Sequence, residues 1–292
     1  MNIIITGALG FIGSHTADKF IKEDWEVYGI DDLSTGKKEN FKGNVEIGDI
    51  RTFDFEKFPK PDVIFHAAAK ASVQGSIENP AEFHDHNVNG SLRVIEYAKK
   101  HDIPIVFASS AAVFGNASIV PTPEYAERRP ISPYGLHKYI VEEYLRVYNL
   151  LYGLRSIILR YFGVYGERQP ETEGYQTVLS TFLKQKKEGN PFTIVGMGNQ
   201  RRDFVYVKDV AEANYQAAKA FERGMKFETF NIGTGTDYSI TEIANMIDKD
   251  HPKTYLLPRL EPRITSCNNF RAKQYLFWEP EIKLPKWIKN IL

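Results

Sequence analysis

The feature that most constrains the fold is an alternation, through the first half of the chain, of short apolar runs with longer amphipathic segments. The apolar runs are bounded by turn residues and predict buried strands at residues 2–6, 26–31, 45–47, 63–66, 105–108 and 155–160. The segments near residues 11–23, 80–101 and 133–152 have a helical period. Strands that alternate with helices pair in parallel, so the sequence predicts a doubly wound α/β fold with six buried strands.

The second half of the chain follows this alternation less regularly. We predict helices near residues 177–187, 210–221 and 240–248 and a strand at 192–195, whereas residues 251–262 contain three prolines and predict a loop. The sequence therefore predicts two domains, a larger one over residues 1–168 and a smaller C-terminal α/β domain over 169–292, with some segments interleaved.

The charge balance excludes several kinds of partner. Lys plus Arg equals Asp plus Glu at 37 each, so no excess positive field attracts nucleic acid or an anionic membrane. The single cysteine, Cys267, excludes an internal disulfide and a thiolate-rich metal site. We expect a cytoplasmic protein that binds anions only at a local site, with no nucleic-acid or membrane partner.

Three glycines follow the first predicted strand and open the first predicted helix. Gly7, Gly10 and Gly13 lie where free backbone N–H groups and the helix dipole favour a phosphate, and glycine lets that phosphate approach closely. An ordinary strand-to-helix turn is the alternative for this motif taken alone.

An acidic pair follows at the end of the second predicted strand. Asp31 lies 18 residues after Gly13, close to the spacing at which a carboxylate binds the adenine ribose of a dinucleotide and repels a 2′-phosphate. The alternative is that Asp31 and Asp32 are solvated turn residues. Together with the glycines, the pair predicts a Rossmann domain that binds NAD rather than NADP.

A candidate catalytic set lies further along the chain. Tyr134 and Lys138 are four residues apart in a predicted helix, so they share a face, and a nearby ammonium lowers the pKa of a phenol. Ser110 follows the fifth strand, at the edge where such sheets bind ligands. The alternatives are a solvent-exposed Tyr–Lys pair and Ser109 in place of Ser110.

Ten motifs, in order along almost the whole chain, resemble the extended short-chain dehydrogenase/reductase family, in particular its sugar-nucleotide 4-epimerases. The motifs are residues 7–13, Asp31-Asp32-Leu33-Ser34-Thr35-Gly36, Gly48-Asp49-Ile50-Arg51, His66-Ala67-Ala68-Ala69, Asn87-Val88-Asn89-Gly90, residues 109–115, residues 132–138, Leu159-Arg160-Tyr161-Phe162, residues 202–207 and Asn231-Ile232-Gly233.

The resemblance implies a cofactor site, a substrate site and a homodimer. The cofactor site comprises Gly7, Gly10, Phe11, Ile12, Gly13, Asp31, Asp32, Leu33, Ser34, Thr35, Gly36, Asp49, Ile50, Ala67, Ala68, Ala69, Asn87, Tyr134, Lys138 and Phe162. The substrate site comprises Ser110, Tyr134, Gly163, Arg202 and Arg259, with Arg259 preferred to Arg263. Gly163 stands where the epimerases usually carry an asparagine that contacts the substrate diphosphate.

The residues after Ser110 favour one reaction within this family. Related dehydratases carry an Asp-Glu pair there, which they need as acid and base, whereas this chain has Ala111-Ala112. We therefore expect an NAD-dependent 4-epimerase of a nucleotide-diphosphate sugar, UDP-glucose or an N-acetylated analogue, that works through a 4-keto intermediate.

Three other readings of the function remain. They are a reductase of a keto-sugar nucleotide, a related dehydratase or decarboxylase, and a non-catalytic NAD-binding regulator. His84, Asp85 and His86 have no further ligand set around them in the sequence, so we predict no metal site.

Overall fold

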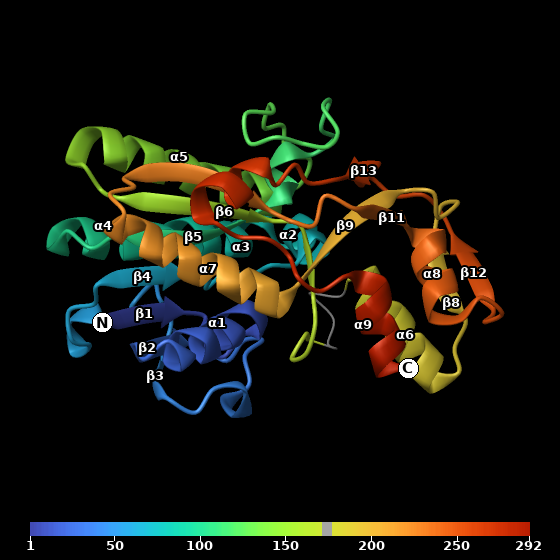
Figure 1. The fold of residues 1–292 in the computed structure, drawn as a ribbon, viewed down its shortest axis with the longest axis horizontal. Coiled ribbons are helices and arrows are strands. Elements are labelled where there is room, and N and C mark those ends of the chain that lie inside the picture. The colour runs from blue at the N-terminus through green and yellow to red at the C-terminus, as the bar shows by residue number, and fades with distance from the viewer. Residues whose placement is uncertain (171–176) are drawn as a thin grey trace.

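The computed structural model describes residues 1–170 and 177–292, and its largest element is a parallel sheet of seven strands (Figure 1). The strand order is β10-β6-β5-β4-β1-β2-β3. The strands are β1 (Asn2–Thr6), β2 (Glu26–Asp31), β3 (Asn44–Ile47), β4 (Val63–His66), β5 (Ile105–Ser110), β6 (Ser156–Tyr161) and β10 (Phe227–Ile232). The order reverses between β1 and β4, which is where doubly wound sheets bind ligands.

Both faces of this sheet are buried, as the alternation of side chains along β1 illustrates. Ile3 and Ile5 pack in the cluster that includes residues of α1 (Phe11–Lys22) and α7 (Val207–Glu222). Ile4 points the other way, into the cluster that includes residues of α4 (Gly90–His101) and α5 (Pro133–Tyr152). A strand covered on both faces reads as a continuous apolar run, which is why β1 was predictable.

The prediction of six buried strands is wrong in two respects. The edge strand β3 is largely exposed, and β10 adds a seventh strand beside β6. In β10 the apolar Phe230 and Ile232 are mixed with the polar Glu228, Thr229 and Asn231, so its apolar signal is weak. Both β10 and α7 come after residue 168 in the chain but belong to the layers of the large sheet.

The helix predicted over residues 80–101 is interrupted. The chain forms α2 (Val73–Glu78), α3 (Pro80–His84), a π-helical turn (Asp85–Asn89) and then α4. Single π turns inside helices are frequent at functional sites, and this one spans only residues 85–89, which is shorter than the window over which a helical period is recognised.

The remaining strands, with α6 (Val178–Glu188), α8 (Ile240–Asp248) and α9 (Leu284–Ile291), form a smaller α/β region, most of which lies at the right of Figure 1. Its strands are β7 (Gly163–Tyr165), β8 (Phe192–Val195), β9 (Arg201–Tyr206), β11 (Asp237–Ser239), β12 (Lys253–Leu256) and β13 (Ile264–Thr265). The loop predicted over residues 251–262 is therefore wrong in part, because β12 pairs with β8 over four residues. Such a short exposed strand carries little apolar signal.

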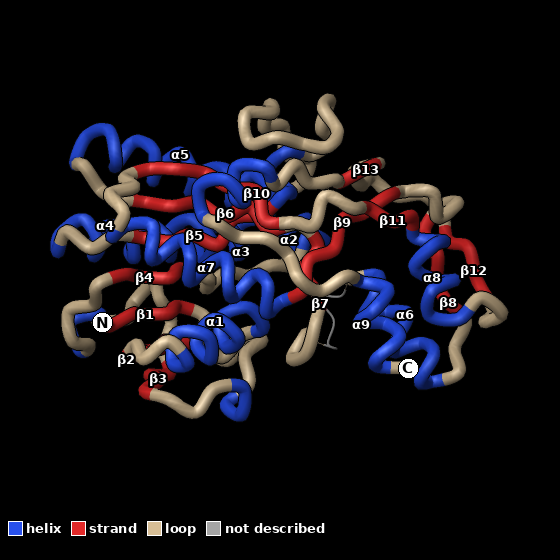
Figure 2. Tube along the Cα trace, in the orientation of Figure 1, coloured by secondary structure: helices blue, strands red, loops and turns tan. Residues whose placement is uncertain are grey.

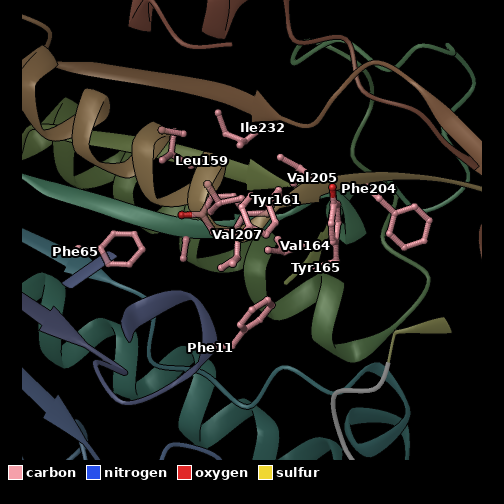
Figure 3. Close-up of a cluster of buried hydrophobic side chains, with 14 of the residues drawn as sticks. Phe11, Phe65, Leu159, Tyr161, Val164, Tyr165, Phe204, Val205, Val207 and Ile232 are labelled. Atoms are coloured by element: carbon pink, nitrogen blue, oxygen red, sulfur yellow. The ribbon is translucent and has the colours of Figure 1, made fainter. Parts of the chain in front are cut away.

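One apolar core joins the sheet to the smaller region. Figure 3 shows Phe65 and Leu159 of the sheet in the same cluster as Tyr165 of β7 and Phe204 of β9. In Figure 2, β7 lies between the large sheet and the smaller region. No helix in the described part of the chain is long and apolar enough to cross a membrane.

Candidate active site

A cavity of about 610 Å³ lies at the carboxyl edge of the large sheet. It is bordered by the segments that follow β1, β2, β4 and β5, and on the far side by Arg202 of β9 and Thr265 of β13. The sequence-predicted site residues that line it are Gly7, Gly10, Phe11, Ile12, Gly13, Asp31, Asp32, Ser34, Thr35, Asp49, Ile50, Ala67, Ala68, Ala69, Ser110, Tyr134, Lys138, Phe162, Gly163 and Arg202.

Four predicted site residues are not among the lining residues. The backbone N–H of Leu33 donates to Asp31, and a Cβ at Gly36 would lie 2.6 Å from the Asp31 carboxylate. The Asn87 amide makes two hydrogen bonds to the backbone of Lys70, which follows the Ala67–Ala69 segment. Leu33, Gly36 and Asn87 therefore contact residues of the lining without lining the cavity themselves. The Arg259 side chain, in contrast, is 65% exposed.

The glycine loop leaves no room for side chains. A Cβ at Gly13 would lie 2.0 Å from the Gly7 carbonyl oxygen, and one at Gly7 would lie 2.9 Å from the Ala68 nitrogen, with Gly7 at φ +72°. Helix α1 begins here, and among the described residues no side chain caps it and no acid occupies its first turn. Its N–H groups and dipole are thus available to a diphosphate, and the loop fits the pyrophosphate of a dinucleotide.

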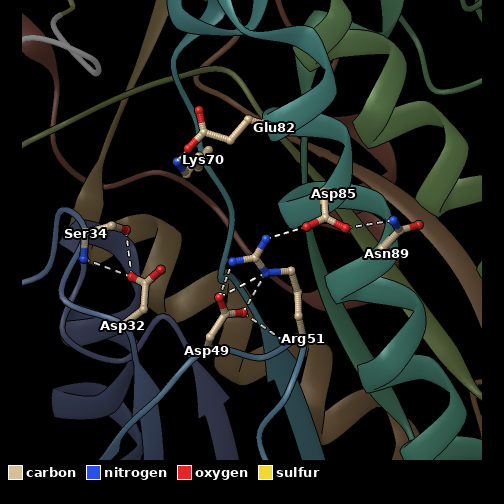
Figure 4. Close-up of polar contacts among 8 residues, drawn as sticks. All are labelled: Asp32, Ser34, Asp49, Arg51, Lys70, Glu82, Asp85 and Asn89. Carbon is tan, nitrogen blue, oxygen red and sulfur yellow. Dashed lines mark hydrogen bonds and ion pairs between the residues drawn. The ribbon is translucent and has the colours of Figure 1, made fainter.

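The two aspartates after β2 have different environments. Asp31 is buried and accepts hydrogen bonds from the backbone of Leu9 (2.9 Å) and Leu33 (2.8 Å), and burial raises its pKa against the effect of these bonds. A carboxylate has about four acceptor sites, more than these backbone bonds occupy, so Asp31 can also accept a hydrogen bond from a ribose hydroxyl. Asp32 instead accepts from the backbone and hydroxyl of Ser34 in a turn (Figure 4).

An ion-pair chain fixes the next acid along the cavity. The Arg51 guanidinium grips the carboxylate of Asp49 and also pairs with Asp85 in the π-helical turn (Figure 4). Arg51 holds the pKa of Asp49 below its usual range. Arg51 therefore links Asp49 to Asp85, which lies where the helix is interrupted at residues 85–89.

Tyr134 and Lys138 project from the first turns of α5. Ser132 caps this helix and Pro133 occupies its first position. The Lys138 ammonium donates to the Ala108 carbonyl at 2.7 Å. Burial lowers the pKa of Lys138 to about 7, with a smaller opposing effect of Glu142.

The two serines at the end of β5 make different hydrogen bonds. The Ser109 hydroxyl donates to the buried carboxylate of Glu142 at 2.6 Å, while the Ser110 hydroxyl accepts from the backbone of Ala112 at 3.2 Å; both residues border the cavity. Successive strand residues point to opposite faces, so only one of the two can serve the site in this way. The geometry favours Ser110.

The far side of the cavity carries one guanidinium. Arg202 is held by Glu261 at 2.9 Å and by the Arg201 carbonyl. Gly163 lies beside it in β7, where a Cβ would fall 2.8 Å from the Asp203 carbonyl oxygen. The backbone packing of β7 against β9 thus explains why a glycine occupies this position.

Sequence reasoning missed several lining residues. Lys70 directly follows the predicted Ala67–Ala69 segment, so its place in the sequence could have predicted that it lines the cavity. Its ammonium pairs with Glu82 (Figure 4). Ser132 could have been found as the helix cap before Pro133. Glu261 reaches the cavity from the proline-rich segment, and no motif marks it.

The comparison with known families identifies the class of protein. The model of the NAD dependent epimerase/dehydratase family matches residues 3–233. The chain therefore belongs to this family of enzymes, and NAD is its cofactor. The uncapped α1, the glycine loop and Asp31 fit that cofactor.

Several relatives cover the whole chain. A Methanocaldococcus jannaschii protein described as "Putative UDP-glucose 4-epimerase" is 40% identical over 99% of this chain and 97% of its own length. A UDP-glucose 4-epimerase from Thermotoga maritima, solved with UDP-glucose, has a TM-score of 0.91 and 35% identity, covering 99% of this chain and 96% of that one.

A third relative carries a different ligand. A UDP-N-acetylglucosamine 4-epimerase from Methanobrevibacter ruminantium, in complex with UDP-N-acetylmuramic acid, has a TM-score of 0.90 and 32% identity, covering 100% of this chain and 99% of that one. These likenesses confirm the predicted family and the predicted Rossmann-type fold.

Replacing Gly13 with alanine should abolish NAD binding, because the added methyl would collide with the Gly7 carbonyl. NADH fluorescence titration measures the effect. Gly189→Ala is the control: the positive φ of Gly189, which Gly13 does not share, strains an alanine, but a Cβ there meets nothing within 4 Å. Unchanged NADH affinity in Gly13→Ala would contradict our account of the loop.

Lys138→Met should stabilise the cofactor-free protein in a pH-dependent way. Because the pKa of Lys138 falls from 10.5 to about 7 on folding, the cost of burying its charge is complete below pH 7 and vanishes as the pH rises towards 10.5. We expect a gain on the order of a few kcal/mol near neutral pH, shrinking as the pH rises. Denaturant unfolding across this range measures it.

The control for this prediction is Lys100→Met, since the Lys100 side chain is 67% exposed. A stabilisation by Lys138→Met that is the same at every pH would show that the charge of Lys138 is not its cause.

Proposed function

We propose that this enzyme is a 4-epimerase of a UDP-sugar. The observation that carries the proposal is the composition of the cavity around Ser110, Tyr134 and Lys138. Among the described lining residues the carboxylates are Asp31, Asp32, Asp49 and Glu261. The first three follow β2 and β3, at the glycine-loop side, and Glu261 is paired with Arg202, so elimination chemistry at Ser110 would lack its acid and base.

In the proposed mechanism, Tyr134 removes the proton of the sugar 4-hydroxyl, and Ser110 orients that hydroxyl and then the ketone. NAD, when bound at the glycine loop and Asp31, would supply a reversible acceptor for the C4 hydride. Lys138 holds its ammonium next to the reacting end of α5, where a positive charge stabilises a phenolate. The 4-keto sugar rotates within the cavity, so that its opposite face is reduced. Tyr134 returns the proton, and the configuration at C4 is inverted without net oxidation.

Arg202 is our candidate for holding the substrate diphosphate while the sugar turns. A guanidinium binds phosphate oxygens in bidentate fashion, and this one borders the cavity opposite the glycine loop. In the structure this guanidinium donates to the Glu261 carboxylate, which is an anion as a phosphate is. We propose Arg259, on the same segment as Glu261, as a second contact, and Gly163 as a wall of the sugar pocket.

The relatives support UDP as the nucleotide and suggest two candidate sugars, glucose and N-acetylglucosamine. The Thermotoga maritima relative was solved with UDP-glucose and the Methanobrevibacter ruminantium relative with an N-acetylated sugar nucleotide. We propose both UDP-glucose and UDP-N-acetylglucosamine as candidate substrates. Residues 1–168 with α7 and β10 would bind NAD, and the rest of residues 169–292 would hold the sugar nucleotide.

Purified protein incubated with UDP-glucose or UDP-N-acetylglucosamine should form the corresponding 4-epimer without continued consumption of NAD. Tyr134→Phe should lower turnover by roughly 10²-fold or more, because it removes the base, while NADH affinity stays unchanged. Chromatography of the sugar nucleotides and NADH fluorescence measure the two quantities.

Other outcomes of this experiment identify other functions. Stoichiometric NADH consumption with a keto-sugar nucleotide would show a reductase. Full activity in Tyr134→Phe would overturn the assignment of the base. NADH binding without any product from either sugar would contradict the proposed substrates.

We also propose that the protein is a cytoplasmic homodimer that associates through the outer surfaces of α3 and α5. Leu136 of α5 is 45% exposed, and an open apolar groove beside it is lined by Pro80 and Ala81 of α3. The lone Cys267 is buried and free, as a reducing compartment allows.

Leu136→Glu should convert the dimer into a monomer, because it places a charge in the proposed apolar contact. Light scattering after size-exclusion chromatography measures the mass. Leu150→Glu, at the other end of α5 and 75% exposed, is the control. A wild-type monomer would overturn the proposal.

A further inference from the structure

A buried ion pair lies directly behind the catalytic set. Arg160 of β6 donates to both carboxylate oxygens of Glu142 on α5, at 2.9 and 2.6 Å, and both side chains are 2% exposed. A third guanidinium N–H donates to the Glu124 carbonyl at 2.8 Å. Two buried charges of this kind contribute little net stability compared with apolar side chains of the same size, so their role needs another explanation.

The position of Glu142 links this pair to the site. Tyr134, Lys138 and Glu142 are spaced by four residues along α5, so they form one stripe that faces the sheet. Glu142 also accepts the hydrogen bond of Ser109, the residue before Ser110. One carboxylate thus joins the helix of the proposed base to the strand end of the proposed hydroxyl donor.

We infer that Glu142 is a positioning residue for the reaction: with Arg160 and Ser109 it locks the end of β5 against α5, and its negative charge favours the ammonium form of Lys138. This inference rests on the proposed function for the reaction that is positioned. It assigns no contact with substrate to Glu142, which acts through Ser110 and Lys138.

The surroundings of Lys138 explain why this charge matters. Burial lowers the pKa of Lys138, and Glu142 is the group that opposes this shift. His66 of β4 has a pKa of about 3 and is neutral, held between Thr6 and Ser91. From β5, Lys138 meets the Ala108 carbonyl and the Phe107 ring.

The other titratable or charged groups near this stripe are Tyr134 on the same helix and Arg160 of β6, which faces Glu142. Arg160 brings no negative charge to Lys138, and Tyr134 would bring one only as the phenolate of the proposed reaction. Neutralising Glu142 therefore removes the carboxylate that favours the charged form of Lys138, and the lysine should lose its proton at a lower pH.

The test is an NMR titration of the cofactor-loaded protein carrying lysine labelled at Cε, with Lys138→Met to assign the signal. Glu142→Gln keeps the size of the side chain and should lower the titration midpoint of Lys138 by roughly one pH unit. The matched control is Glu143→Gln on the outer side of α5, which removes a carboxylate paired with Arg146 and should leave the midpoint unchanged.

Two further variants separate the hydrogen bond from the charge. Ser109→Ala removes the link to β5 and should lower kcat roughly tenfold with KM and the Lys138 midpoint unchanged. Glu142→Asp keeps the charge but shortens the reach, so it should lower kcat while its midpoint stays closer to wild type than that of Glu142→Gln.

The outcomes distinguish this inference from the proposed function. An unchanged midpoint in Glu142→Gln, or unchanged kcat in Ser109→Ala, overturns the inference even if the wild type is a 4-epimerase. A wild type inactive on both UDP-sugars overturns the proposed function, while the midpoint still tests the charge of Glu142. If Glu142→Gln does not fold, the double variant Glu142→Gln/Arg160→Gln leaves no unpaired guanidinium and takes its place in the titration.

Discussion

The coverage of a parallel sheet on both faces is the constraint on which the rest of this structure depends. Helices α1 and α7 cover one face and α4 and α5 the other, so ligands can reach the strands only at their ends. Because the strands are parallel, their carboxyl ends share one edge. The glycine loop, the acids after β2 and the serine after β5 therefore meet there, although more than a hundred residues separate Gly7 from Ser110.

The buried charged groups at the site are stabilised in three different ways. Asp31 is held by backbone N–H groups, Arg160 and Glu142 compensate one another, and Lys138 donates to a backbone carbonyl and is influenced by the charge of Glu142. The least compensated of these groups is the one whose pKa moves close to neutrality. A lysine that is costly to bury in the empty protein is poised to interact with anionic or polar groups brought by ligands.

Sequence patterns predicted those parts of the fold and site that rest on local rules. The period of α5 and the spacing of Tyr134 and Lys138 are contained in one short segment. The strand β10 was missed because its polar residues weaken the apolar run, and the π-helical turn at Asp85 was missed because it is shorter than the window over which a helical period is recognised. The choice between Ser109 and Ser110 stayed open because alternation assigns opposite faces without saying which face meets the site.

By itself the sequence determined the family, the cofactor class and six of the seven strands of the large sheet, because glycine spacing and apolar runs act between near neighbours. Only the tertiary structure decided which groups share the cavity. Arg202 borders it while Arg259 stays outside its lining, Asn87 acts through the Lys70 backbone, and Glu142 lies behind Lys138 against Arg160. These relations depend on packing between distant segments, and a linear pattern does not encode the distance between two side chains that different strands bring together.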